Sequence, residues 1–133
     1  IYFYSGVTRP KILQLNKGIF GLNVNMLSKT APLDYSPPPI MLHINSYGGS
    51  VFAGLAAVDY IKNSKIPVHT IIDGCAASAA TLMSCVGSHR MMHKNIYREH
   101  TKIPKKEMDN ILKHDIWWEA EKCLQYGLVD ELI

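Results

Sequence analysis

The stretch "INSYGGSVFAGLAAVDYIKNSKIPVHTIIDGCAASAATLMS", residues 44–84, decides the fold. Its first residue, Ile44, is the last residue of a predicted strand over 40–44, and a turn that contains two adjacent glycines follows. A helix is then expected from about Ser50, a second strand over 68–72, and a helix of small residues that runs through Cys85. Strands and helices that alternate with connections this short predict βαβ units around a mostly parallel sheet. The predicted fold class is therefore α/β.

Other periodic segments continue this alternation on both sides of the stretch. Apolar residues three and four positions apart predict a first helix from Ile12, and Pro104 and Gly127 mark the start and the end of two later helices. The helix from Ser50 is expected to bury one apolar face, which carries Val51, Leu55, Val58 and Ile61. The remaining predicted elements are strands over 1–4 and 90–92, an edge strand over 128–133, and a helix over 119–126.

Length and composition describe an ordinary globular chain. Its 133 residues are 47 % apolar and 19 % charged with a net charge of +3, which predicts one domain over 1–133. The basic residues are scattered without interleaved aromatic residues, which argues against a nucleic-acid partner. No apolar run is long enough to span a membrane, and the first residues lack the layout of a signal peptide. Three cysteines without CxxC spacing favour reduced thiols, a cytoplasmic location and no metal site.

Ser78 is the candidate nucleophile, since it stands among alanines where a strand turns into a helix. In parallel α/β sheets, the loops at the carboxyl ends of the strands carry the chemistry. A helix start also offers unpaired amides and a positive dipole end to a developing oxyanion. Gly48 and Gly49 can turn their own amides outward without obstruction by a side chain. The alternative is that these small residues only allow tight packing.

The same stretch resembles the proteolytic subunits of the Clp proteases, which share a ClpP/crotonase-like fold. That family has an I-N-S-P-G-G turn followed by a helix, a strand and a G-x-A-A-S-M-G-A turn, and its C-terminal ending is similar to "HDIWWEAEKCLQYGLVDELI", residues 114–133. The resemblance implies that Ser78 is the nucleophile, Asp115 orients the base, and the amides of Gly48 and Ala79 form the oxyanion hole. Substrate would lie in extended form beside Gly49, Ser50 and Val51.

The catalytic histidine of the family has no counterpart in this chain. In the family it stands in a strand after a P-N-S turn, ahead of a long helix, and that whole segment is missing where Asn95 meets Ile96. His93 is the nearest substitute. Either a segment of the natural chain is omitted between Asn95 and Ile96, with a smaller omission within 7–10, or the protein lacks the base. The first explanation is preferred, because loss of a strand and a long helix would expose the core.

The resemblance implies an ATP-dependent serine endopeptidase that hydrolyses unfolded polypeptides through an acyl-enzyme and serves protein quality control. Its subunits would form heptameric rings stacked in pairs, and an AAA+ Clp unfoldase would deliver the substrate. The partner would use the ATP, because the chain has no phosphate-binding G-x-x-x-x-G-K-[ST] loop and needs no cofactor of its own. Two alternatives stay open: a non-catalytic structural subunit of a mixed ring, and a crotonase-type acyl-CoA enzyme.

Overall fold

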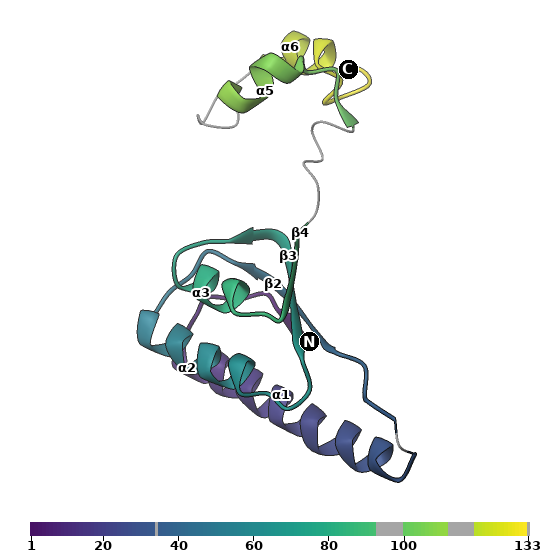
Figure 1. Ribbon diagram of the computed structural model, residues 1–133. Coiled ribbons are helices and arrows are strands. Elements are labelled where there is room, and N and C mark those ends of the chain that lie inside the picture. Colours follow the sequence, from purple (N-terminus) through teal and green to yellow (C-terminus); the bar gives the residue numbers. More distant parts are fainter. Residues whose placement is uncertain (34, 93–99, 112–118, 133) are drawn as a thin grey trace. The chain divides into compact units, whose positions relative to one another are not determined.

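The computed structural model describes residues 1–33, 35–92, 100–111 and 119–132. It divides the chain into two compact units, Ile1–His93 and Lys94–Ile133, which are described separately (Figure 1). The single domain expected over 1–133 stays a prediction. No helix within the described ranges is long and apolar enough to cross a membrane.

The first unit is built on a four-stranded sheet in which every strand pairs in parallel with the strand before it. Its strands, in the order β1-β2-β3-β4, are β1 (Tyr2–Phe3), β2 (Ile40–Ser46), β3 (Val68–Ala76) and β4 (His89–Met92). Strand β3 is longer than predicted, because it continues past Ile72 and pairs again with β2 at Ser46 and Ala76, beyond an irregularity in the register. The predicted parallel α/β architecture is confirmed.

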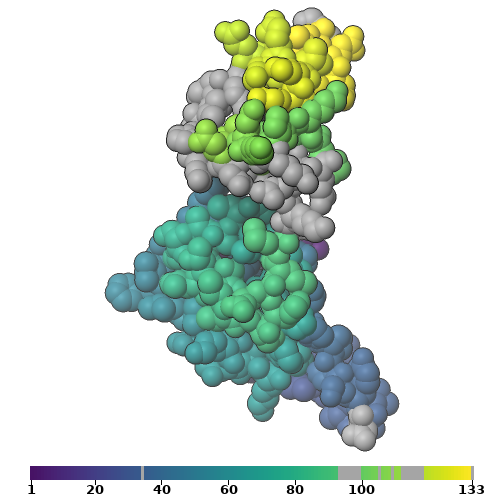
Figure 2. Space-filling view, turned by 45° about the horizontal axis from the view of Figure 1, so that its top comes forward, coloured from purple at the N-terminus to yellow at the C-terminus, as the bar shows by residue number. Residues whose placement is uncertain are grey.

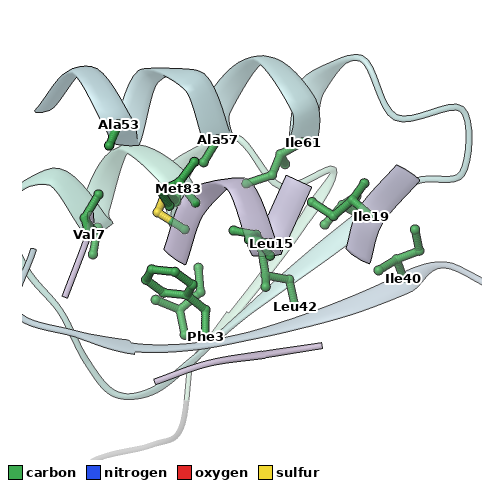
Figure 3. Packing of buried hydrophobic residues seen from close by; sticks show 14 of the residues in the cluster. Phe3, Val7, Leu15, Ile19, Ile40, Leu42, Ala53, Ala57, Ile61 and Met83 are labelled. Atoms are coloured by element: carbon green, nitrogen blue, oxygen red, sulfur yellow. The ribbon is translucent and has the colours of Figure 1, made fainter. Parts of the chain in front are cut away.

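Three helices connect successive strands and lie on the same side of the sheet (Figures 1 and 3). They are α1 (Arg9–Thr30), which is followed by the short 3₁₀ turn η1 (Ala31–Leu33), α2 (Val51–Lys62) and α3 (Ala79–Cys85). Because right-handed crossovers add each strand on the same side of the last one, all three helices cover one face. Figure 3 shows the core between them, to which β1, β2 and all three helices contribute side chains that include Phe3, Leu15, Leu42, Ala57 and Met83.

Helix α2 buries only part of the face that the sequence predicted: Ile61 is buried and Val58 is half-buried, but the two residues nearer its start are not. Val51 and Leu55 remain 51 % and 46 % exposed, whereas the buried residues are Ala53, Gly54, Ala57 and Ile61. The reason is close packing between helices: a β-carbon on Gly54 would lie only 3.1 Å from the carbonyl oxygen of Ala79 at the start of α3. Helices that approach this closely need small residues between them, so the larger apolar side chains of α2 point elsewhere.

A buried asparagine fixes the connection between α2 and β3 against α1. The side-chain amide of Asn23 donates to the carbonyl of Ile19 at 2.8 Å and to the hydroxyl of Ser64 at 2.9 Å, and its oxygen accepts the N–H of Ile66 at 2.9 Å. These bonds satisfy polar groups that would otherwise be costly to bury. They hold the loop that leads into β3 in one place.

The second unit has a small apolar cluster of its own. Helix α5 (Lys105–Ile111) contributes Met108, and residues beside it and beside α6 (Ala120–Gln125) contribute Ile103 and Tyr126. The Tyr126 hydroxyl donates to the carboxylate of Glu107 at 2.7 Å. Gly127 has φ +66 after α6, as expected of a helix end. The edge strand predicted over 128–133 is wrong, since residues 128–132 are not in a strand; they follow the α6 turn, where the N–H of Leu128 donates to the Cys123 carbonyl at 2.9 Å.

The face of the sheet that points away from the helices carries a polar network across β1, β2 and β3. The hydroxyl of Tyr4 donates to the Asp73 carboxylate at 2.7 Å, and Nδ1 of His43 lies 2.8 Å from the same oxygen. The ring of Tyr2 stacks on His43 at a centroid separation of 4.7 Å. One carboxylate thereby connects three neighbouring strands.

Because of this network, we expect the Tyr4 hydroxyl to lose its proton at a higher pH than an ordinary tyrosine does. The hydrogen bond to Asp73, together with the negative charge of that carboxylate, raises the pKa of Tyr4 above its ordinary value. The contribution of this bond to stability is therefore present below the unfolded pKa of about 10, and it is lost as the pH rises through the higher folded pKa. In a chain with ¹³C-labelled tyrosines, the Tyr4 Cζ signal should titrate at higher pH than in the Asp73→Asn variant. Asp59→Asn, an exposed carboxylate on α2, is the control, and an unchanged Tyr4 midpoint in Asp73→Asn would contradict the assignment.

Candidate active site

Ser78 lies at a strained turn between β3 and α3. It has φ 51° and ψ −127°, and it is the one non-glycine residue with positive φ in the described ranges. Its side chain is exposed and makes no capping bond to the helix that follows. A serine held in a rarely populated conformation costs about 1–3 kcal/mol, and such residues concentrate at functional sites. The strain therefore favours the nucleophile interpretation over simple packing.

The glycine turn after β2 lies directly against this serine. A β-carbon on Gly48 would come within 2.7 Å of both the carbonyl oxygen of Ala77 and the β-carbon of Ser78. The N–H of Ala77 also donates to the carbonyl of Ser46 at 2.9 Å, which holds the two turns together. Only a residue without a side chain fits at Gly48, and its φ of +99 is also one that glycine tolerates best. The sequence predicted both turns, and the structure brings them into contact.

The chain before α1 fixes the other side of the glycine turn. The N–H of Val7 donates to the Gly48 carbonyl at 2.8 Å, and the N–H of Ser50 donates to the Val7 carbonyl at 2.8 Å. In this parallel bridge Gly49 is opposite Val7. A β-carbon on Gly49 would overlap the carbonyl oxygen of Val7, so this position also excludes a side chain.

Two backbone amides in these two turns are candidates for binding a substrate oxygen. The N–H of Ala79 at the start of α3 and the N–H of Gly49 have no hydrogen-bond acceptor among the described residues. The donor predicted at Gly48 is engaged instead, because its N–H donates to the Ser46 hydroxyl at 3.1 Å. Two amides aimed at one oxygen are what an oxyanion hole requires. The geometry therefore favours Gly49 and Ala79 as the pair.

The sequence contains a signal that the amide of Gly48 is engaged and that of Gly49 is not. A serine often bonds the backbone N–H two residues later in a local turn, and Ser46 stands two residues before Gly48. That pattern identifies Gly48 as the amide taken up by the turn. It leaves the next amide, that of Gly49, as the open donor.

The predicted substrate strip is exposed. Gly49, Ser50 and Val51 all lie at the surface, beside the buried Gly48. Ser50 also has a structural role, because its hydroxyl accepts the N–H of Ala53 at 3.3 Å and caps α2. Figure 2 shows that the stretch containing both turns and the helices after them, coloured blue-teal to green, forms much of the visible surface of the first unit. An extended chain would meet backbone at Gly49 and an apolar side chain at Val51.

The remaining predicted members of the site lie outside the described residues. These are Asp115, the substitute His93 and the junction between Asn95 and Ile96. No imidazole or carboxylate contacts the Ser78 hydroxyl in the part of the chain that the structure describes. The His43–Asp73 pair belongs to the outer face of the sheet, where Asp73 also accepts from Tyr4. The structure thus describes an exposed serine at a strained turn and two backbone amides without acceptors among the described residues.

A parallel α/β unit with an exposed serine at a strained strand-to-helix turn, next to open amides, has the features of a serine hydrolase. The family model described as Clp protease matches residues 32–95 and 88–133 of this chain. The chain belongs to the Clp protease family, which is a family of serine peptidases.

Individual relatives agree with this assignment. The ATP-dependent Clp protease proteolytic subunit of Streptococcus gordonii is 30 % identical, with 98 % of this chain and 88 % of that protein covered, and that of Deinococcus radiodurans is 25 % identical, with 98 % and 83 % covered. These alignments span 172 and 170 residues, whereas the chain has 133. A solved structure of a ClpP1 mutant from Listeria monocytogenes has the same fold, with a TM-score of 0.55 at 21 % identity over 100 % of this chain and 90 % of that one.

Ser78→Gly should stabilise the folded chain. Glycine adopts positive φ without strain, so the free energy of unfolding should rise by about 1 kcal/mol. The matched control is Ser78→Ala, which also removes the hydroxyl but keeps the β-carbon and the strain. Urea unfolding of the three chains measures the difference. Equal midpoints for Ser78→Gly and Ser78→Ala would show that the turn stores no strain.

Gly49→Ala should destabilise the first unit strongly. The new methyl group would overlap the backbone of Val7, which cannot move without loss of its two hydrogen bonds to the turn. We expect a loss of about 3 kcal/mol in the free energy of unfolding. The control is Gly21→Ala on α1, where nothing lies within 4 Å of the added carbon, so a gain of about 0.5–1 kcal/mol is expected. A Gly49→Ala chain as stable as the unmodified one would contradict the Val7 contact.

Proposed function

We propose that Ser78 is the nucleophile of a Clp-type endopeptidase that hydrolyses peptide bonds of unfolded polypeptides. The single observation that carries this proposal is the strained, exposed Ser78 with the open amides of Gly49 and Ala79 beside it. Packing alone does not require a serine in a strained conformation, and the turn before α3 leaves the Ala79 amide without an acceptor next to that serine. Both features have a use in acyl transfer.

In the proposed reaction, the hydroxyl oxygen of Ser78 attacks the carbonyl carbon of the scissile peptide bond. Its proton passes to an imidazole, and the carbonyl oxygen takes up the negative charge and is held by the N–H groups of Gly49 and Ala79. The tetrahedral intermediate expels the amine, which receives the proton from the imidazolium, and an acyl-Ser78 ester remains. Water, deprotonated by the same imidazole, then hydrolyses that ester and restores the hydroxyl.

The imidazole in this scheme comes from a segment that belongs between Asn95 and Ile96, and Asp115 orients it. Two observations support the existence of such a segment. The family model matches the chain in two stretches that overlap at 88–95, next to this junction. The alignments with relatives also run longer than the chain, so those relatives contain residues in the aligned span that have no counterpart here.

We also propose that the subunit works in stacked heptameric rings in the cytoplasm, supplied by an AAA+ unfoldase that uses the ATP, as part of protein quality control. The relatives are named ATP-dependent proteolytic subunits, which implies an energy-using partner for them. This chain carries a groove of about 430 Å³ between α1 and α2 whose exposed walls include Phe20, Val24 and Tyr60. Exposed apolar surface of this extent is usual for a protein that assembles with others.

A non-catalytic subunit of a mixed ring is the second candidate. The observation that favours it is the absence of a base on Ser78 in the described ranges. Such a subunit would fold and assemble, and its serine would be inert. The strained conformation of Ser78 is no evidence for the third candidate, an acyl-CoA enzyme.

The deciding experiment is labelling of the serine with a fluorophosphonate probe. The protein is purified from its natural source, and its intact mass is compared with the 14.9 kDa of the 133-residue chain. If the mass is several kilodaltons higher, tandem sequencing should place a histidine between Asn95 and Ile96. That protein should be labelled at Ser78 and should hydrolyse peptides at least about 10³-fold faster than its Ser78→Ala variant.

The control variant is Ser36→Ala, which removes an exposed serine far along the chain from the site and should leave labelling unchanged. A protein of the higher mass that is folded but unlabelled would overturn the peptidase. A mass equal to that of the 133-residue chain, without labelling, would establish the non-catalytic subunit.

A further inference from the structure

A second groove lies between the N-terminal halves of α1 and α2, apart from the larger groove at their other ends. It has a volume of about 240 Å³, and its apolar walls are Ile12, Leu13, Phe52, Ala53 and Ala56. Two of these lining residues are highly exposed for apolar side chains: Phe52 is 81 % exposed and Leu13 is 56 % exposed. No described residue of the first unit covers them. The groove has room for one bulky apolar side chain.

A buried acceptor without a donor lines the same groove. The side chain of Asn16 is 7 % exposed, and its amide nitrogen donates to the Ala56 carbonyl at 3.3 Å. Its oxygen Oδ1 is buried and accepts no hydrogen bond. A buried amide oxygen left unpaired costs about 1–3 kcal/mol, and this is the one such side-chain atom among the described residues. A donor on a bound molecule would remove that cost.

The open end of the groove is positively charged. Arg9, the first residue of α1, lines it and makes no ion pair with any described residue. The first turn of α1 contains no acidic residue, and the Thr8 side chain makes no capping bond. The start of a helix carries a partial positive charge from the helix dipole, and the Arg9 guanidinium adds a full positive charge beside it. Both attract an anion. An acidic group is the complement of this end.

We propose that this groove binds a short acidic peptide segment of a partner protein through one bulky apolar side chain. The side chain fills the space beside Phe52 and Leu13, an acidic residue next to it pairs with Arg9, and a backbone or side-chain N–H of the segment donates to Asn16 Oδ1. The apolar walls, the unpaired acceptor and the unpaired cation come from different residues. Together they specify the same ligand chemistry. The proposal does not depend on catalysis at Ser78.

The test is fluorescence polarisation of the full natural protein, with any segment found between Asn95 and Ile96, and a fluorescein-labelled peptide, GGDLDGG. Its affinity should exceed those of GGDADGG and GGNLNGG by about tenfold each, which corresponds to one partly buried leucine or one ion pair with its neighbours. Arg9→Glu should lose most of the affinity and of the salt dependence. Phe52→Ser should lose affinity but keep the salt dependence.

Matched variants distinguish binding at this groove from non-specific attraction of the peptide to positive charge or to exposed apolar side chains elsewhere. Lys17→Glu makes the same charge change elsewhere on α1, and Phe20→Ser removes an exposed aromatic residue from the other groove; both should bind as the unmodified chain does. Asn16→Leu should unfold at a higher urea concentration and bind more weakly, because it removes the unpaired acceptor. Equal affinity for the three peptides, or equal losses in Arg9→Glu and Lys17→Glu, would overturn the proposal. Self-association would also overturn it: if the mass in solution rises with protein concentration, and this rise is absent in Arg9→Glu, the groove is occupied by a second copy of the chain.

Discussion

The contact between two backbone turns is the constraint on which the first unit depends. Gly48 lies against Ala77 and Ser78, and Gly49 lies against Val7, at distances that exclude any side chain. The carboxyl ends of β2 and β3 and the chain entering α1 are thereby held together at one end of the sheet. The same contact brings the glycine turn against Ser78 and the amide of Ala79. Architecture and candidate chemistry at this end of the sheet therefore have one cause.

Much of the fold was predictable because hydrophobic periodicity is local information. The apolar spacing from Ile12 gave α1, and the glycine turns and Pro67 gave the limits of β2 and β3 to within a few residues. The buried face of α2 was only partly predictable in this way. Ile61 is buried as expected, but Val51 and Leu55 stay exposed, because close approach to α3 at Gly54 selects small residues for the interface. Periodicity identifies a helix, whereas the distance to its neighbours decides which side is buried.

The candidate site shows a similar division. Ser78 and the glycine pair were evident from residue type and order, but the positive φ of Ser78 depends on how the turn after β3 packs against β2. The choice between Gly48 and Gly49 as the donor rests on one hydrogen bond, which the Gly48 N–H donates to the Ser46 hydroxyl and which only the spacing of these two residues indicates in the sequence. The base stays a prediction, because His93 and the junction between Asn95 and Ile96 lie outside the described residues. Sequence order thus predicts which groups take part, and backbone hydrogen bonds decide which atoms are free.

The strand order has a consequence for the time at which these groups meet. Each strand of the first unit pairs with the strand made just before it, so the chain can fold progressively from its N-terminus while it is still being synthesised. The bridge from Val7 to Gly49 can close once β2 and the start of α2 have emerged. Ser78 can take up its strained conformation only after that, because the surface against which it is pressed is the glycine turn itself. The Ser78 hydroxyl is therefore set in place late in the formation of this unit, and a growing chain carries an unconstrained serine there until the turns around it have formed.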